Sequence, residues 1–113
     1  MPHDLDQLRD RLRNFAEARA WGKSHSPRNL ALALTAEVGE LTAELQWTGD
    51  AAVPKLLADP TARARLADEV ADVLIYLVQF ADVCGIDLLG EAHAKIERNE
   101  LRYPANMSTY SSM

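Results

Sequence analysis

Two rows of acidic side chains are the residues whose types and spacing best suit chemistry. In the segment AEVGELTAELQW, Glu37, Glu40 and Glu44 stand at i, i+3 and i+7. In DEVADVLIYL, Glu69 and Asp72 repeat the i, i+3 spacing. On a helix, which turns about 100° per residue, each row forms a stripe beside the apolar stripe that faces the core. The two rows are therefore expected to converge where the two helices pack.

Converging carboxylates predict a divalent cation. Like charges at close range need a counter-charge, and hard oxygen ligands select Mg²⁺, with Mn²⁺ as a possible substitute. One Glu-x-x-Glu pair alone is more simply explained as a solvated helix face. Here two helices carry such pairs, and Arg28 is the only lysine or arginine between Lys23 and Lys55. The neighbouring acids Glu44 and Asp68 are outer ligands or solvated. The expected metal ligands are Glu37, Glu40, Glu69 and Asp72.

A ferritin-like di-iron centre is the redox alternative for such a helical site. That class uses Glu-x-x-His on two of its helices. The histidines are His3, His25 and His93, and none has a glutamate three residues before it. An all-carboxylate set favours Mg²⁺ and phosphate chemistry instead.

Cap and stop signals predict four helices to carry these residues. Their expected ranges are Asp4 to about Trp21, Ser26 to about Thr48, Asp59 to about Cys84, and Asp87 to Pro104, with 51–58 as a connector that has room for one helical turn. No stretch has strand periodicity. We expect an all-α four-helix bundle in one domain (1–104), followed by a poorly ordered tail (105–113). Helices this amphipathic in so small a chain predict an oligomer.

Composition narrows the class of protein. The 113 residues carry a net charge of −5, which argues against a nucleic-acid polymer as partner. The single cysteine, Cys84, excludes an internal disulfide, and the N-terminal sequence does not resemble a signal peptide. The most apolar run, 70–86, is too short to span a bilayer and contains Asp72 and Asp82. We expect a cytoplasmic protein that does not bind membranes.

Two further groups of residues have both a functional and a structural explanation. Lys95, Asn99 and Arg102 share one face of the last helix, where they can bind phosphate or simply complement the helix dipole. Trp21 and Trp47 each stand at a helix end, where they can enclose a planar base or cap the core. Position alone does not decide either case.

Three segments resemble one known family. RNLALALTAEVGELTAELQW, DEVADVLIYLVQFADVCGIDL and KIERNELRYP are similar to the all-α nucleoside triphosphate pyrophosphohydrolases of the MazG type, and most similar to the dCTP pyrophosphatase branch. The family signature, Glu-Glu-x-x-Glu followed by Glu-x-x-Asp, appears with Ala36 at its first position and 28 residues between Glu40 and Glu69. The resemblance covers about residues 5–104.

The resemblance implies Mg²⁺-dependent hydrolysis of a nucleoside triphosphate to the monophosphate and pyrophosphate. Glu37 or Glu40 would then also act as the general base. Residues implied to bind substrate are Trp21, His25, Arg28, Trp47, Tyr76, Lys95, Asn99 and Arg102. The family forms homodimers or homotetramers in which helices of two subunits shape the site, and its implied role is cleansing of the nucleotide pool.

Two departures and two alternatives accompany the resemblance. Ala36 replaces the first signature glutamate, a change that the dCTP branch tolerates. Leu12 stands where that branch can place a histidine against the base, so cytosine preference follows less directly than hydrolysis. The alternatives are a non-enzymatic helical interaction module and an enzyme like phosphoribosyl-ATP pyrophosphohydrolase.

Overall fold

The computed structural model describes residues 4–105, and every regular element in that range is helical. The α-helices are α1 (Leu5–Ala18), α2 (Pro27–Leu45), α3 (Val53–Ala58), α4 (Pro60–Val83) and α5 (Leu88–Arg102). Two short 3₁₀ helices, η1 (Gly22–Ser24) and η2 (Asp50–Ala52), lie in the connections. The prediction of an all-α chain is confirmed. The predicted tail falls mostly on residues 106–113, which lie outside the described range.

The helix starts follow from the capping side chains. Ser26 accepts the backbone N–H of Asn29 at 3.1 Å, and prolines follow both Ser26 and Asp59 at the first helical position. Asp87 accepts the N–H of Gly90 at 3.2 Å and so starts α5. Gly85, at φ +68°, ends α4, because its left-handed conformation is open to glycine without steric cost. Each of these starts and stops was predicted.

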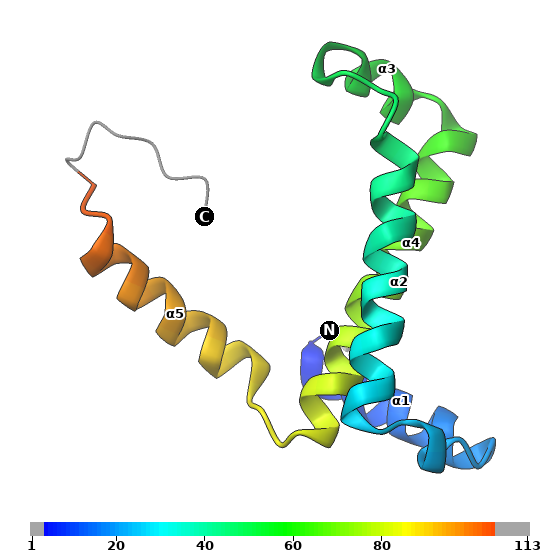
Figure 1. Cartoon of the computed structure of the whole chain (residues 1–113), viewed down its shortest axis with the longest axis vertical. Helices are drawn as coiled ribbons and strands as arrows, with labels where there is room; N and C mark the ends of the chain where they lie inside the picture. The colour runs from blue at the N-terminus through cyan, green and yellow to red at the C-terminus, as the bar shows by residue number, and fades with distance from the viewer. Residues whose placement is uncertain (1–3, 106–113) are drawn as a thin grey trace.

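The core lies between α2 and α4, which run side by side (Figure 1). Helix α1 crosses the end of this pair, and α3 covers its other end. Arg13 on α1 holds Asp82 on α4 through two hydrogen bonds, of 2.8 and 2.5 Å. Leu30 is the largest side chain that is fully buried within the described residues. One chain alone therefore builds only a thin core.

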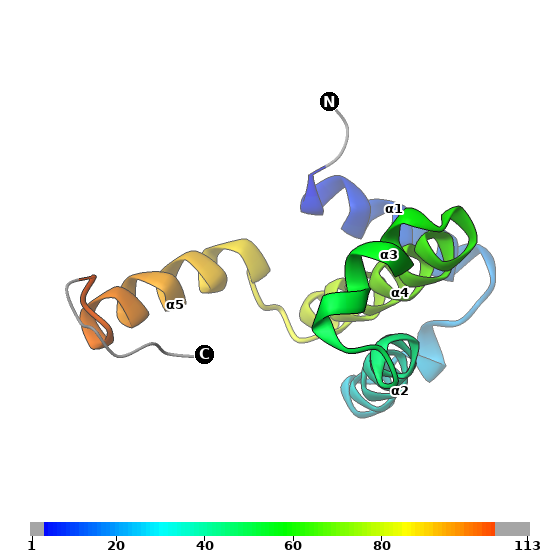
Figure 2. The same ribbon diagram turned by 90° about the horizontal axis from the view of Figure 1, so that it is seen from above.

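Helix α5 leaves this core as a separate arm. The directions of α4 and α5 differ by 98°, and the views in Figures 1 and 2 both show α5 standing away from the other helices. Within residues 4–105, α5 makes few contacts with α1 to α4. Its apolar side chains Leu89, Ile96 and Leu101 are exposed.

The predicted four-helix bundle needs correction on this point. Four helices lie close to the predicted ranges, but the last one does not pack with the others within the chain. Helix α1 ends at Ala18, earlier than predicted, and the connector 51–58 contains η2 and α3. The radius of gyration is 17.3 Å, against about 13 Å for a compact chain of this length. Among the described residues no single helix is long and apolar enough to cross a membrane; α4 and α5 reach that length and hydropathy only together, across their bend.

Candidate metal and nucleotide site

The two predicted acid rows meet between α2 and α4. One carboxylate oxygen each from Glu37, Glu40 and Glu69 lies within 4.8 Å of the other two. A second group of the same kind contains Asp68, Glu69 and Asp72. Glu69 belongs to both groups and joins them. The convergence follows from the i, i+3 spacing on each helix, because it points both rows toward the same side of the α2–α4 contact.

Burial and like charge raise the pKa of two of these acids, Glu37 and Glu69. Burial raises the pKa of Glu37, and the charges of Asp72, Glu40 and Asp68 raise it further. Burial likewise raises the pKa of Glu69, with Glu40 the strongest of its charged neighbours. The Oε2 atom of Glu69 is buried and has no hydrogen-bond partner within the described residues. A buried oxygen without a partner among clustered acids suits a divalent cation, so the residues fit the implied metal.

The neighbouring acids divide into two kinds. Glu44, the third member of the α2 row, pairs with Arg65 on α4 at 3.4 Å. Arg65 is 21 residues away in the chain, so the absence of nearby lysine or arginine around Glu44 did not reveal this partner on the facing helix. Asp68, although exposed, lies with Glu69 and Asp72.

An aromatic cleft of 390 Å³ adjoins the acids and shares Asp72 with them. Its lining comes from α1, α4 and the segment around η1, and includes three predicted substrate-binding residues: Trp21, His25 and Tyr76. The volume falls within the range of about 300–1,000 Å³ that is typical of small-molecule sites. The structure thus brings these three side chains together next to one acid.

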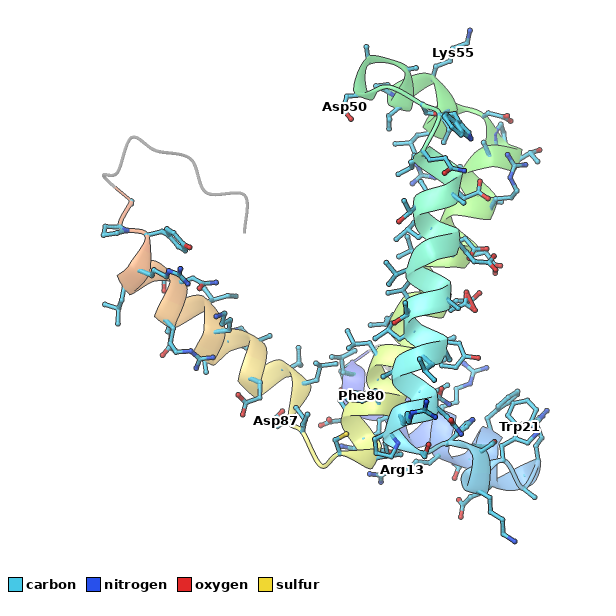
Figure 3. The ribbon with its side chains drawn as sticks, in the orientation of Figure 1. Arg13, Trp21, Asp50, Lys55, Phe80 and Asp87 are labelled. Atoms are coloured by element: carbon cyan, nitrogen blue, oxygen red, sulfur yellow. The ribbon has the colours of Figure 1, made fainter. Side chains whose placement is uncertain are left out.

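The aromatic rings at this cleft support one another. Phe15 and Trp21 meet edge to face with ring centroids 5.6 Å apart, and Trp21 meets His25 at 6.3 Å. The guanidinium of Arg19 lies 3.6 Å from the centroid of the Phe15 ring. Trp21, at the outer side of this end of the molecule in Figure 3, remains 46% exposed. It forms an open wall on which a planar ring can stack.

Other predicted substrate-binding residues lie elsewhere in the chain. Trp47 follows the far end of α2, is 90% exposed and does not line the cleft. It therefore does not face Trp21 within one chain. Arg28 is exposed on the first turn of α2. Lys95, Asn99 and Arg102 lie on α5, which stands away from the acids (Figures 1 and 3).

Phe15 and Gln79 are among the lining residues of the cleft that sequence reasoning missed. Phe15 continues the helical spacing of Leu8 and Leu12 on α1, a pattern that indicates a core residue. Gln79 stands three residues after Tyr76, so it continues the stripe of Glu69, Asp72 and Tyr76 along α4. Extending that stripe by one more turn would have found it.

Both acid rows fall in a region that matches a known protein family. A model described as the MazG-like family matches residues 32–112, which include both acid rows. The chain belongs to the MazG-like family. The resemblance noted in the sequence is thereby confirmed at the level of the family.

The curated relatives of this MazG-like chain include dCTP pyrophosphatase 1 of Rattus norvegicus and of Homo sapiens. Each is 43% identical over 108 residues, which is 96% of this chain. The matched region is 64% of the length of either relative, so the chain spans less than two thirds of those proteins.

A solved structure provides the match in three dimensions. The chain resembles the crystal structure of a pyrophosphatase from Archaeoglobus fulgidus with a TM-score of 0.83 and 38% identity. The match covers 90% of this chain and 94% of the archaeal chain. That share is larger than residues 4–87 alone provide, so the likeness extends onto α5.

Proposed function

We propose that this chain is a Mg²⁺-dependent nucleoside triphosphate pyrophosphohydrolase that releases pyrophosphate and a nucleoside monophosphate. Its proposed substrate is dCTP or a modified dCTP in the cytoplasmic nucleotide pool. One observation carries the proposal: the buried, unpartnered oxygen of Glu69 lies among acids that adjoin an aromatic cleft through Asp72. Membership of the MazG-like family and the dCTP pyrophosphatases among the relatives support it.

Glu37, Glu40, Glu69 and Asp72 would hold the cation. When bound there, Mg²⁺ (or Mn²⁺ in its place) supplies positive charge to the phosphate oxygens of the substrate. The net charge of −5 makes such a counter-charge necessary for a polyanionic substrate.

Glu37 and Glu40 are the candidates for the general base that takes a proton from the attacking water. In this arrangement Trp21 and Tyr76 hold the base in the cleft, with His25 beside them. Because Asp72 belongs to both the cleft and the acid cluster, a base in the cleft would leave the triphosphate beside the cation that the acids would hold.

The active form is proposed to be a homodimer or a homotetramer built from dimers. The accessible surface is 8823 Å², whereas a compact monomer of 12.5 kDa has about 6,200 Å². An excess of this size is comparable to what a stable homodimer buries. The exposed apolar residues of α5 indicate that this arm packs on the partner chain.

Packing of α5 on a partner chain would also account for the predicted substrate-binding residues that lie far from the acids within one chain. In the dimer, α5 brings Lys95, Asn99 and Arg102 to the acids of the partner chain, where they bind phosphate. Trp47 is likewise placed to complete the partner's site. Helices of two subunits then form each active site, as the family resemblance implies.

The direct test is pyrophosphate release from canonical and 5-substituted NTPs and dNTPs, measured with Mg²⁺ and with EDTA. Mg²⁺-dependent release confined to dCTP and its relatives is the expected result. Release from every base would keep the chemistry and remove the cytosine preference. No release by folded protein would favour a helical interaction module and overturn the proposed activity.

A further inference from the structure

Gln79 continues the functional stripe of α4 into the aromatic cleft. Glu69, Asp72, Tyr76 and Gln79 stand at i, i+3, i+7 and i+10, so they lie along one side of the helix. Gln79 lies two turns beyond Asp72, about 10 Å along the helix axis. A nucleotide whose phosphates lie at the acids therefore extends its base toward Gln79.

The surroundings of Gln79 leave its carboxamide open to a ligand. The side chain is half-buried and lines both the 390 Å³ cleft and an adjoining one of 270 Å³. Leu12, which lines both clefts too, gives this region an apolar floor. No described residue forms a hydrogen bond with the Gln79 side chain. The carboxamide is therefore free to hydrogen-bond with a molecule that enters the cleft.

Gln79 also differs in kind from the other polar residues that line the cleft. Arg11 is exposed at its rim, Asp72 belongs to the acid cluster, and His25 is in ring contact with Trp21. Gln79 is the only carboxamide among the lining residues, and it presents a donor and an acceptor side by side. The Watson–Crick edge of a base presents a complementary pair, so this side chain can form two hydrogen bonds with a base in the cleft.

We infer that Gln79 is the base-reading residue of this chain and that it recognises a 4-aminopyrimidine. Its amide N–H donates to ring atom N3, and its carbonyl oxygen accepts a hydrogen bond from the 4-amino group. Uracil and thymine present the opposite pattern, a donor at N3 and an acceptor at O4, which the carboxamide matches only when it is turned over by about 180°. The choice of the 4-amino pattern comes from the proposed substrate. This inference rests on the proposed function and assigns its specificity to a named side chain.

The test pairs a change in the protein with a change in the substrate. The variant Gln79→Leu keeps a similar volume and removes both hydrogen bonds. The substrate probes are dCTP, dTTP and the dCTP analogue that lacks the 4-amino group. The control is Gln7→Leu, an exposed change on α1 away from the cleft. The readout is kcat/KM for every combination of enzyme and substrate, with melting temperatures to show that each variant is folded.

The wild-type chain and the control are expected to prefer dCTP over the analogue by up to about tenfold, as expected for the one neutral hydrogen bond that the analogue lacks. In Gln79→Leu this preference falls to near one, because dCTP loses both hydrogen bonds while the analogue loses only the one to N3. The variant Gln79→Glu, whose ionised carboxylate accepts but cannot donate, recovers part of the preference for the 4-amino group. It also serves as the deciding variant if Gln79→Leu does not fold.

Two outcomes overturn the inference in distinguishable ways. An unchanged ratio of dCTP to analogue in folded Gln79→Leu, or an equal loss on all three substrates, shows that Gln79 does not read the base. Pyrophosphate release by the wild type in those same assays leaves the proposed function intact. Absence of release by the wild type overturns the proposed function itself, and the inference with it.

Discussion

Glu69 is the residue at which stability and proposed chemistry conflict. Its buried oxygen lacks a hydrogen-bond partner in the described part of the chain. Burial raises the pKa of Glu69, and the charges of four neighbouring acids raise it further. Without a cation, that arrangement destabilises the folded state, because the buried charge is neither solvated nor paired. Sites that bind ligands commonly keep such locally unfavourable groups. The conflict allows the role of the acids to be tested by both activity and stability.

The first prediction concerns the cation ligands. Glu40→Gln and Glu69→Gln each remove a charged oxygen from the cluster while keeping the side-chain shape. Pyrophosphate release is expected to fall by more than about 100-fold, because changes outside the ligand shell already cost 10- to 100-fold. The matched control is Glu44→Gln, on the same stripe of α2 but paired with Arg65. That control is expected to stay within about threefold of the wild type, since exposed pairs of this kind contribute little. Near-normal turnover in Glu69→Gln would exclude the acid cluster as the active site.

The second prediction concerns pH in the metal-free protein. The folded-state pKa values of Glu37 and Glu69 are raised above the ordinary 4.5, so the native state binds more protons than the unfolded state above that pH. The free energy of unfolding therefore falls as pH rises from about 4.5 through the raised values. In EDTA, Glu69→Gln should melt higher than the wild type at pH 7, and the gap should close near pH 4.5. Mg²⁺ should narrow the gap at pH 7 by stabilising the wild type alone. A gap that does not depend on pH would contradict the charge explanation.

At the scale of the elements, one ion pair fixes α1 to α4. Arg13 and Asp82 form two hydrogen bonds, and the Arg13 guanidinium lowers the pKa of Asp82 below its ordinary 3.8. Asp82 also raises the pKa of Arg13. The pair lies beside the cleft shared by α1 and α4, so it sets how far Leu12 and Phe15 stand from Tyr76 and Gln79. Loosening it is therefore expected to change the shape of the nucleoside cleft.

The third prediction follows from the lowered pKa of Asp82. A carboxyl with a lowered folded-state pKa contributes stability above its unfolded value, and this contribution is lost as pH falls through the folded value. Asp82→Asn should lower the melting temperature by a few degrees at pH 7, and the difference should shrink as the pH falls from 3.8 through the lowered folded-state pKa. The double variant Arg13→Gln/Asp82→Asn measures the coupling, which should vanish over the same interval. A pH-independent difference would show that the pair acts through packing and not through charge.

The helices themselves were largely predictable, whereas the contacts between them were not. Ser26, Asp59 and Asp87 mark helix starts because capping acts over three or four residues. The acid rows were predictable for the same reason, since i, i+3 spacing fixes a shared helix face. Arg13–Asp82 and Glu44–Arg65 join residues far apart in sequence, and nothing local indicates such partners.

At the scale of the whole molecule, the direction of α5 decides which residues can meet. The turn at Gly85 was predicted from its glycine, but the 98° bend that follows depends on what the helix packs against. The sequence pattern identifies the apolar face of α5, but it does not identify the surface against which that face packs. Since the described residues of one chain cover that face poorly, the partner proposed here is a second copy. Lys95 and Arg102 then act on the other chain's acids.

The final prediction tests this exchange by mixing two inactive variants. Glu69→Gln disrupts the acid cluster. The double variant Lys95→Ala/Arg102→Ala keeps α5 but removes the two cations proposed to bind phosphate. If α5 acts on the partner chain, a mixed dimer contains one site with both defects and one with neither. Co-refolding equal amounts should restore about a quarter of wild-type activity, because half of the dimers are mixed and half of their sites are intact. If the arm acts within its own chain, every site carries one defect and no activity returns. A control mixture of Glu69→Gln with Glu40→Gln must stay inactive in both cases, since both defects then lie in the acid cluster.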